Sequence, residues 1–211
     1  MSHFTVAVIT KTGNEQEVEQ LLAPFQENNM GDCPKQYLKF NEDEDYDIDE
    51  ETGKKGYWEN PNAKWDWFVI GGRWSNLIKN KNGNRSDVEK INNIDLSIDE
   101  ELYQEFMRYW EVVVEEQEIL PSEDKMNFFS FYNKRYYTEQ YRTKENYATQ
   151  QASFGTFAVI SPDGNWIEKG EMGWFGVNDA TDESRENYIN QFNQLLEKYP
   201  EYYLTVVDCH I

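Results

Sequence analysis

The sequence is short of positive charge. It carries 20 lysine and arginine residues against 40 aspartate and glutamate residues, so its formal net charge is −20 at pH 7. Proteins that wrap nucleic acid without sequence preference need a basic surface, and this composition argues against direct nucleic-acid binding. It permits a small anionic ligand held by a few local cations. It also permits the opposite role, in which an acidic surface imitates nucleic acid.

Cysteine, histidine and long apolar runs are scarce as well. Cys33 and Cys209 lie far apart, so free reduced thiols are expected, as in a reducing compartment. With two histidines and no CxxC or HxxEH pattern, the sequence predicts no metal and no cofactor. No stretch approaches the roughly 18 apolar residues of a membrane helix, and residues 1–4 do not begin a signal peptide. We therefore expect a cytoplasmic protein without a membrane partner.

The order of the apolar patterns predicts an α+β fold for the 211 residues as a single domain, 1–211. Two helices are expected between strands, one capped by Asn14 and one capped by Thr181 or Asp182. This order fits a ferredoxin-like, mostly antiparallel sheet with helices on one face. The expected strands are Phe4–Ile9, Trp65–Ile70, Thr156–Ile160, Asn165–Lys169 and Tyr203–Cys209.

A helical insertion is expected at about 97–150. Ser97 and Glu100 form a capping-box pattern before the first of its helices. Pro121 should end that pattern, and Ser122 can cap a second helix. The aromatic stripe of these helices is more typical of core than of a ligand platform.

Residues 28–64 are predicted to form an irregular, acidic loop. Repulsion within the acidic run 41–51 disfavours compact packing. The run begins like a calcium-binding EF-hand loop, but Ile48 and Lys54 replace the glycine and glutamate that such a loop requires. A solvated loop is therefore favoured over a calcium site.

The segment Trp65–Ser75 is the strongest candidate for a binding site. Its apolar run predicts a buried strand, and the strand ends at Gly71 and Gly72, where a backbone can turn sharply or approach a ligand. Arg73 follows, and its guanidinium group suits a phosphate or carboxylate, with help from the loop amides. The alternative role of Arg73 is an ordinary salt bridge to one of the many acidic side chains.

Tryptophans beside glycine turns suggest stacking of a flat ring. Trp74 and Trp174 lie in glycine-containing loops and are candidate ligand contacts. Trp67 belongs to the same candidate set, although its strand position is also typical of core. Stacking of a base on such a ring contributes about 1–3 kcal/mol.

Further polar candidates lie near the two ends of the sheet strands. Asp208 and His210 share one face of the last strand, and His3 begins the first, so antiparallel pairing of these strands would bring the histidines together. Such a group could contact a ligand, act as a general base or, less readily, hold a metal. Lys169 and Glu171 complete the candidate set, and Asp66 is a further carboxylate near it.

Five segments carry a resemblance to a known family: Ser2–Val6, Glu59–Trp67, Ile70–Trp74, Gly170–Trp174 and Val206–Ile211. In these segments the chain resembles a widespread family encoded by bacteriophages and mobile elements. It is similar to the anti-CBASS nucleotide sponges, which sequester cyclic dinucleotide or ADP-ribose-type immune signals without cleaving them. The resemblance covers the two terminal strands and the central turn, but neither the acidic loop nor the helical insertion.

Three functions follow from these patterns. The leading hypothesis is a phage anti-defence protein, not an enzyme, that binds a cyclic nucleotide and is assembled as a homo-oligomer to enclose it. The second is an acidic inhibitor that blocks a nucleic-acid-binding protein by mimicry. The third is a nucleotide hydrolase that uses His210, Asp208 or a metal.

Overall fold

The structure, a computed structural model, describes residues 2–123, 127–173 and 178–211. Helices account for 35% and strands for 24%, which confirms the α+β class. Contacts divide the chain into two compact units, one formed by Met1–Asp95 with Thr156–Ile211 and the other by Leu96–Gly155. The second unit contains the helical segment expected at 97–150.

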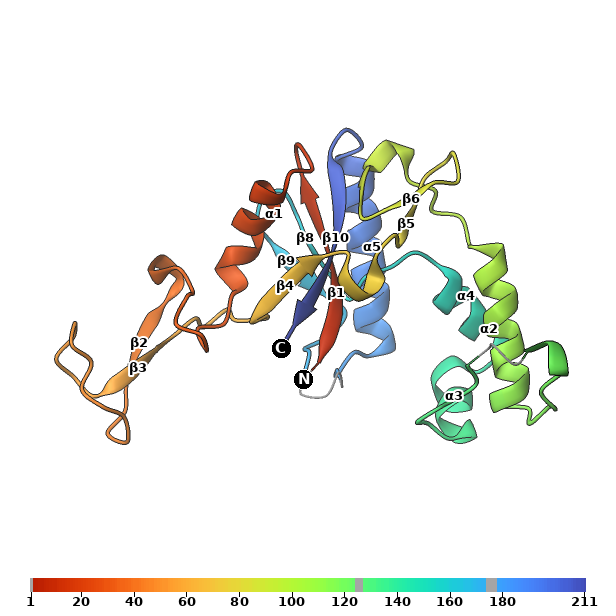
Figure 1. Cartoon of the computed structure of the whole chain (residues 1–211), viewed down its shortest axis with the longest axis horizontal. Helices are drawn as coiled ribbons and strands as arrows, with labels where there is room; N and C mark the ends of the chain where they lie inside the picture. Colours follow the sequence, from red (N-terminus) through yellow and green to blue (C-terminus); the bar gives the residue numbers. More distant parts are fainter. Residues whose placement is uncertain (1, 124–126, 174–177) are drawn as a thin grey trace. The chain divides into compact units, whose positions relative to one another are not determined.

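A mostly antiparallel sheet of six strands forms the centre of the first unit. Its strand order is β4-β10-β1-β8-β9, and β7 also pairs with β10. The two long strands β1 and β10 pair antiparallel over their whole length, so both chain ends lie at one end of the sheet (Figure 1). The strands are β1 (His3–Thr10), β4 (Trp67–Ile70), β7 (Val88–Lys90), β8 (Ala158–Ile160), β9 (Trp166–Glu168) and β10 (Tyr203–His210).

The strand pairing departs from the expected ferredoxin-like arrangement in one respect. β1 pairs with β8 in parallel, whereas the pairs that β10 makes with β1, β4 and β7 and the β8–β9 hairpin are antiparallel. In a ferredoxin-like sheet all neighbouring strands are antiparallel. The long connection between β1 and β8, residues 11–157, allows this difference, because a parallel pair needs a long crossover connection.

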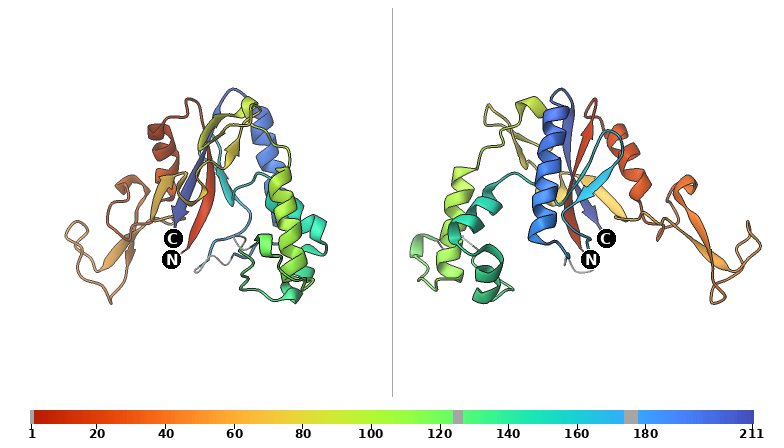
Figure 2. Two further views of the ribbon diagram at one scale, coloured as in Figure 1. Left: turned by 45° about the vertical axis from the view of Figure 1, so that its right-hand side comes forward. Right: turned by 180° about the vertical axis from the view of Figure 1, so that it is seen from behind.

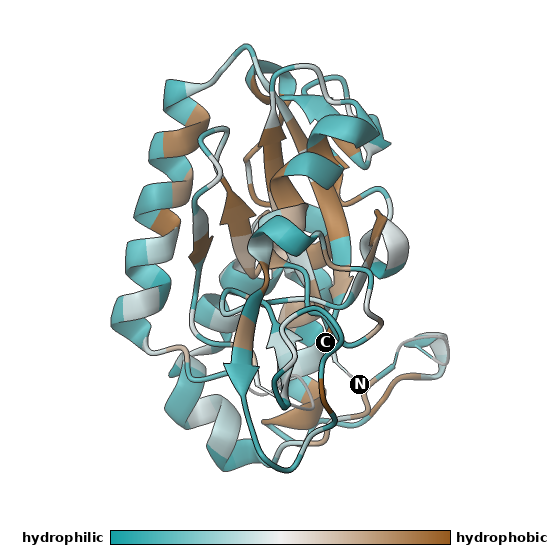
Figure 3. Ribbon diagram, turned by 90° about the vertical axis from the view of Figure 1, so that its left-hand side faces the viewer, coloured by the Kyte–Doolittle hydropathy of each residue, from teal (hydrophilic) through white to brown (hydrophobic). Residues whose placement is uncertain are grey.

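Both faces of β1 are buried, which explains its nearly continuous apolar sequence. Phe4, Val6 and Val8 pack with Val18 and Leu22 on one face. These last two residues belong to helix α1 (Glu15–Leu22), whose first turn is capped by the side chain of Asn14, as expected. Figure 3 shows the most hydrophobic parts of the ribbon in these central strands.

The sequence predicts helices on one face of the sheet, but in the structure they lie on both faces. Helix α5 (Asp182–Lys198) lies behind the sheet in Figure 1 and in front of it in the reversed view of Figure 2. It buries Tyr188, Phe192 and Leu196, and Thr181 caps its first turn. Ala7 and Ile9 point away from the α1 face and are fully buried, so the sheet is covered on both faces.

The acidic segment contains a hairpin rather than the irregular loop that we expected. Strands β2 (Lys39–Glu42) and β3 (Gly56–Glu59) pair antiparallel, and the acidic run lies largely between them. Lysines offset part of its charge, because Lys54 pairs with Glu42 and Lys55 with Glu44. Strands flank this run where helices flank an EF-hand loop, so the EF-hand interpretation is wrong.

β4 is an exposed strand at the end of the sheet order, whereas its apolar sequence predicts a buried one. Trp67 and Val69 are each 44% exposed. Both residues lie opposite β10, where Trp67 faces His210 and Val69 faces Asp208. The face of the sheet that carries these residues is therefore partly open to solvent at β4.

Short elements connect β4 to the second unit. A 3-10 turn, η3 (Gly72–Trp74), follows β4 directly, and η4 (Ile91–Asn93) follows β7. The small strands β5 (Ile78–Lys79) and β6 (Arg85–Ser86) form a separate hairpin. Elsewhere in the described residues, 3-10 turns are formed by η1 (Ala23–Phe25), η2 (Lys35–Tyr37) and η5 (Pro121–Glu123).

The second unit is helical and has an aromatic core, as expected from its sequence. Its helices are α2 (Glu100–Val113), α3 (Lys134–Tyr141) and α4 (Lys144–Ala152). Trp110, Tyr137 and Tyr147 are buried together. Two details differ from expectation: Asp99 rather than Ser97 caps α2, and the helix expected after Ser122 begins only at Lys134 (its residue Met126 lies outside the described residues).

Candidate functional site

Two histidine–aspartate pairs lie side by side at the end of the sheet where β1 begins and β10 ends. The antiparallel register places His3 opposite His210 and His210 opposite Trp67. The prediction that antiparallel pairing of the two terminal strands brings the histidines together is thus confirmed. Side chains that face each other across paired strands lie on the same face, so these three rings share one face of the sheet.

The first pair joins His3 to Asp208. Nδ1 of His3 lies 2.8 Å from Oδ1 of Asp208, and the two side chains are 12% and 2% exposed. The other carboxylate oxygen, Oδ2, accepts a hydrogen bond of 3.0 Å from the backbone amide of Arg73. The buried carboxylate thus has a partner on each oxygen, as buried charges require, and it fixes the orientation of the His3 ring.

The second pair joins His210 to Asp66. Nδ1 of His210 lies 2.6 Å from Oδ1 of Asp66, which also accepts from the Trp67 amide at 2.7 Å. The Asp66 amide in turn donates to the carbonyl of His210 at 2.9 Å. The side chains are 7% and 16% exposed, so this pair is also largely withdrawn from solvent.

The rings of His3, His210 and Trp67 pack against one another. Trp67 stacks on His210 with centroids 5.1 Å apart and planes inclined by 16°. His3 meets both rings edge to face, at 5.0 Å from His210 and 5.2 Å from Trp67. The tryptophan therefore contacts both histidine rings and is also exposed to solvent.

The two glycines allow the chain to turn directly over the first pair. Gly71 and Gly72 have φ angles of +70° and +54°, which disfavour any residue with a side chain. A Cβ atom on Gly72 would lie 2.5 Å from Cβ and Oδ2 of Asp208. On Gly71 it would lie 2.5 Å from the carboxylate of Asp87, a residue that the sequence analysis did not single out.

Three amides of this turn are not available for the phosphate cradle that the sequence suggested. Gly71 donates to the carbonyl of Val206, Arg73 donates to Asp208, and Trp74 donates to the carbonyl of Gly71. These donors are used within the protein, because the turn must satisfy its own backbone where it crosses β10. Recognition of an anion therefore falls mainly to side chains.

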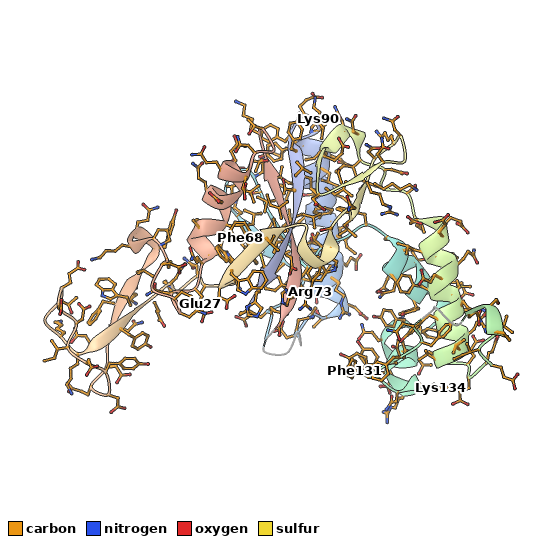
Figure 4. All side chains as sticks on the ribbon, in the orientation of Figure 1. Glu27, Phe68, Arg73, Lys90, Phe131 and Lys134 are labelled. Atoms are coloured by element: carbon orange, nitrogen blue, oxygen red, sulfur yellow. The ribbon has the colours of Figure 1, made fainter. Side chains whose placement is uncertain are left out.

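Arg73 is the middle residue of the η3 turn, and its side chain is exposed. In the ranges that the structure describes, its guanidinium group makes no ion pair with a carboxylate, so the salt bridge considered as its alternative role is not seen. Its amide is tied to Asp208, and Trp74, next in sequence, is partly buried. Figure 4 shows Arg73 on the turn that follows β4.

The structure separates the remaining candidates from this group. Lys169 lies over the ring of Tyr188 at 5.3 Å, and burial, followed by the charge of Arg185, lowers the pKa of its ammonium group. Glu171 lines a small pocket with Phe4, and Phe4 lies on the opposite face of β1 from His3. Glu171 therefore lies across β1 from the histidine group, the Lys169 ammonium group contacts Tyr188 instead, and Trp174 lies outside the described residues.

The surroundings of the pairs are acidic and contain no reactive thiol. A shallow hollow beside Trp67 is lined by Glu19, Asp32 and Asp66, which disfavours entry of an anion from that side. Burial, followed by the charges of Asp208 and Asp66, raises the pKa of Cys209 well above its usual value, so this thiol stays protonated. In the described ranges, no three histidine, cysteine or acidic side chains gather as a metal ion would require.

The described residues include no helix that is long and apolar enough to cross a membrane. Comparison of the chain with protein-family models, with curated proteins and with solved structures gives no match.

Proposed function

We propose that the group formed by His3, His210, Trp67 and Arg73 binds a small anionic nucleotide. The observation that carries this proposal is the exposed Arg73 side chain, which makes no ion pair within the described ranges of a chain that has 40 acidic residues. A guanidinium group that lacks a carboxylate partner remains available for a phosphate, to which it can donate two parallel hydrogen bonds.

The neighbouring rings supply the rest of the recognition. Trp67 is 44% exposed and offers one edge of an aromatic surface to a base, while its face is held by His210. The two imidazoles add hydrogen-bonding groups beside the phosphate position. Because the amides of Gly71, Arg73 and Trp74 are used internally, Arg73 supplies the main positive charge, and its removal should strongly weaken ligand binding.

The class of nucleotide follows from the sequence resemblance. We propose a cyclic nucleotide immune signal, withdrawn from solution in the cytoplasm of a phage-infected bacterial cell. An oligomer would enclose such a ligand more fully than the open face at β4 does alone, because ligand sites normally bury most of the ligand surface.

The proposal is tested by binding measurements with a defined panel. Cyclic dinucleotides, cyclic trinucleotides and cyclic ADP-ribose isomers are added to the purified protein, and the melting temperature and binding isotherm are recorded. A ligand at 100 times its Kd stabilises the folded state by about 2.7 kcal/mol. Size-exclusion chromatography of the complex gives its oligomeric state.

Two arginine variants provide the comparison. Arg73→Ala should abolish the melting shift, whereas Arg135→Ala, which removes an 81%-exposed arginine from α3, should leave it unchanged. Equal effects of both variants would point to nonspecific charge attraction. If no member of the panel shifts the melting temperature, the nucleotide-binding proposal is wrong, and the acidic-inhibitor hypothesis takes its place.

A further inference from the structure

We propose that His3 and His210 act as a general acid–base pair that hydrolyses a phosphodiester bond in the bound nucleotide. This inference rests on the proposed binding function and changes the fate of the ligand, which is cleaved rather than stored. The observation behind it is the presence of two imidazole–carboxylate pairs with ring centroids 5.0 Å apart.

Each imidazole is prepared for proton transfer in the same way. Its Nδ1 is bonded to a carboxylate, which leaves Nε2 as the nitrogen that can give or take a proton. Asp208 and Asp66 act as positioning residues, because each is itself fixed by a backbone amide, from Arg73 and Trp67 respectively. A carboxylate held in this manner sets the tautomer and orientation of a catalytic histidine.

A purely structural role explains the arrangement less well. The chain has only two histidines, and the fold places both at one position. Buried charged or polar pairs are costly to desolvate, and apolar side chains could join the same strand ends as firmly. The nearby face is open at β4, where Trp67 and Val69 are each 44% exposed, and Val69 lies outside the acidic hollow, so a ligand can approach on the side of Val69.

The reaction needs only water as a co-reactant. The neutral imidazole removes a proton from water while the water oxygen forms a bond to phosphorus. The bond from phosphorus to the leaving oxygen breaks, and the protonated imidazole gives its proton to that oxygen. The products are a phosphomonoester and an alcohol, and exchange of protons with solvent restores the two histidines.

The surroundings distinguish the two histidines. The indole face of Trp67 lies against His210, and such a face attracts a cationic ring. His210 is therefore assigned as the proton donor and His3 as the base. Arg73 would stabilise the negative charge that develops on the phosphoryl oxygens.

The experiment measures product and binding separately. The purified protein is incubated with the cyclic nucleotide that binds it best and with bis(p-nitrophenyl) phosphate, and the products are separated by chromatography. Binding is measured with a phosphorothioate analogue, which is cleaved slowly. His3→Asn and His210→Asn should each lower kcat about 100-fold or more, while the Kd of the analogue rises far less because Arg73 supplies the main charge for binding; Arg135→Ala should leave both kcat and Kd unchanged.

A second readout uses the wild-type protein alone. For the wild-type protein, kcat should follow a bell-shaped curve with pH, since one histidine must be neutral and the other protonated. The two imidazole signals in the NMR spectrum are assigned in the wild type, where only His210 is stacked on Trp67, and each signal should change over the pH range of one limb of the curve.

The outcomes separate this inference from the binding proposal. Binding of a nucleotide that is recovered intact after long incubation overturns the inference and leaves sequestration as the function. Cleavage that both His→Asn variants retain also overturns it. Absence of binding to the whole panel overturns the binding function and the inference together.

Discussion

Nδ1 of His3 lies 2.8 Å from Oδ1 of Asp208, across 205 positions of the sequence. This contact joins the start of β1 to the end of β10, and through Oδ2 it continues to the amide of Arg73. The same carboxylate therefore holds the terminal strands together and positions the turn that carries the proposed anion-binding arginine. Changes at this carboxylate should affect stability and ligand binding at once.

Gly72→Ala should destabilise the protein strongly, because the new Cβ would overlap Asp208 and the residue would keep a positive φ angle. We expect a loss of about 3 kcal/mol in the free energy of unfolding. Gly83→Ala is the matched control, because Gly83 has a φ of +82° and open space around its Cβ position. It should cost only about 1 kcal/mol. Urea denaturation of the two variants measures the difference, and equal losses would contradict the packing of the turn on Asp208.

Lys169→Met should stabilise the protein at neutral pH. Burial lowers the pKa of this lysine, so the folded state holds a charged ammonium group at a cost that methionine avoids. As pH rises toward 10.5, the folded protein releases this proton before the unfolded chain does. The free energy of unfolding of the wild type therefore increases with pH and approaches that of the variant. The advantage of the variant should therefore shrink at alkaline pH. Thermal melts at pH 7 and pH 10 test this, and an advantage that does not vary with pH would contradict the burial of the charge.

The tyrosine cluster of the second unit should make the protein sensitive to alkali. Burial, followed by a hydrogen bond with Tyr137, raises the pKa of Tyr109 to about 12. Between pH 10 and about pH 12 the unfolded chain loses this proton and the folded state keeps it, so stability falls as pH rises. Tyr109→Phe should reduce that dependence. Spectrophotometric titration of tyrosinate should show late-titrating residues in the wild type, and a titration that is complete near pH 10 would contradict the cluster.

Thr181→Ala should weaken the start of α5. The Thr181 side chain accepts from the Ser184 amide at 3.1 Å, and the Ser184 hydroxyl is within hydrogen-bond distance, 2.9 Å, of the Thr181 amide. Loss of such a cap costs about 1 kcal/mol, or roughly 2–4 °C in melting temperature for a chain of this size. Thr181→Ser keeps the hydroxyl and should retain most of the stability. A melting temperature that does not change in the alanine variant would contradict the observed cap.

The two thiols should be unreactive in the folded protein. Cys33 and Cys209 are buried, and burial raises the pKa of both. A thiol reagent such as 5,5′-dithiobis(2-nitrobenzoic acid) should therefore react slowly with native protein and rapidly with both thiols in denaturant. Fast reaction of one thiol before unfolding would show that its surroundings open locally.

The sequence by itself determined the elements that depend on local pattern. Apolar runs identified β1 and β10, and polar caps at Asn14 and Thr181 marked the starts of α1 and α5. The chemistry of the glycine turn was also visible, because two glycines followed by an arginine suit a sharp, exposed bend. These features are set by interactions within a few residues, and local sequence is sufficient to predict them.

Only the tertiary structure decided which of the candidate residues act together. Strand pairing joined His3 to Asp208 and His210 to Asp66, while it placed Phe4 and the Glu171 pocket on the opposite face of the sheet. Strand order also exposed Trp67, although its apolar neighbours predict burial. Side chains alternate between the two faces of a strand, and partners far apart in sequence meet only through register. Local pattern carries neither the register nor the order of the strands, so the composition of the site is a property of the fold.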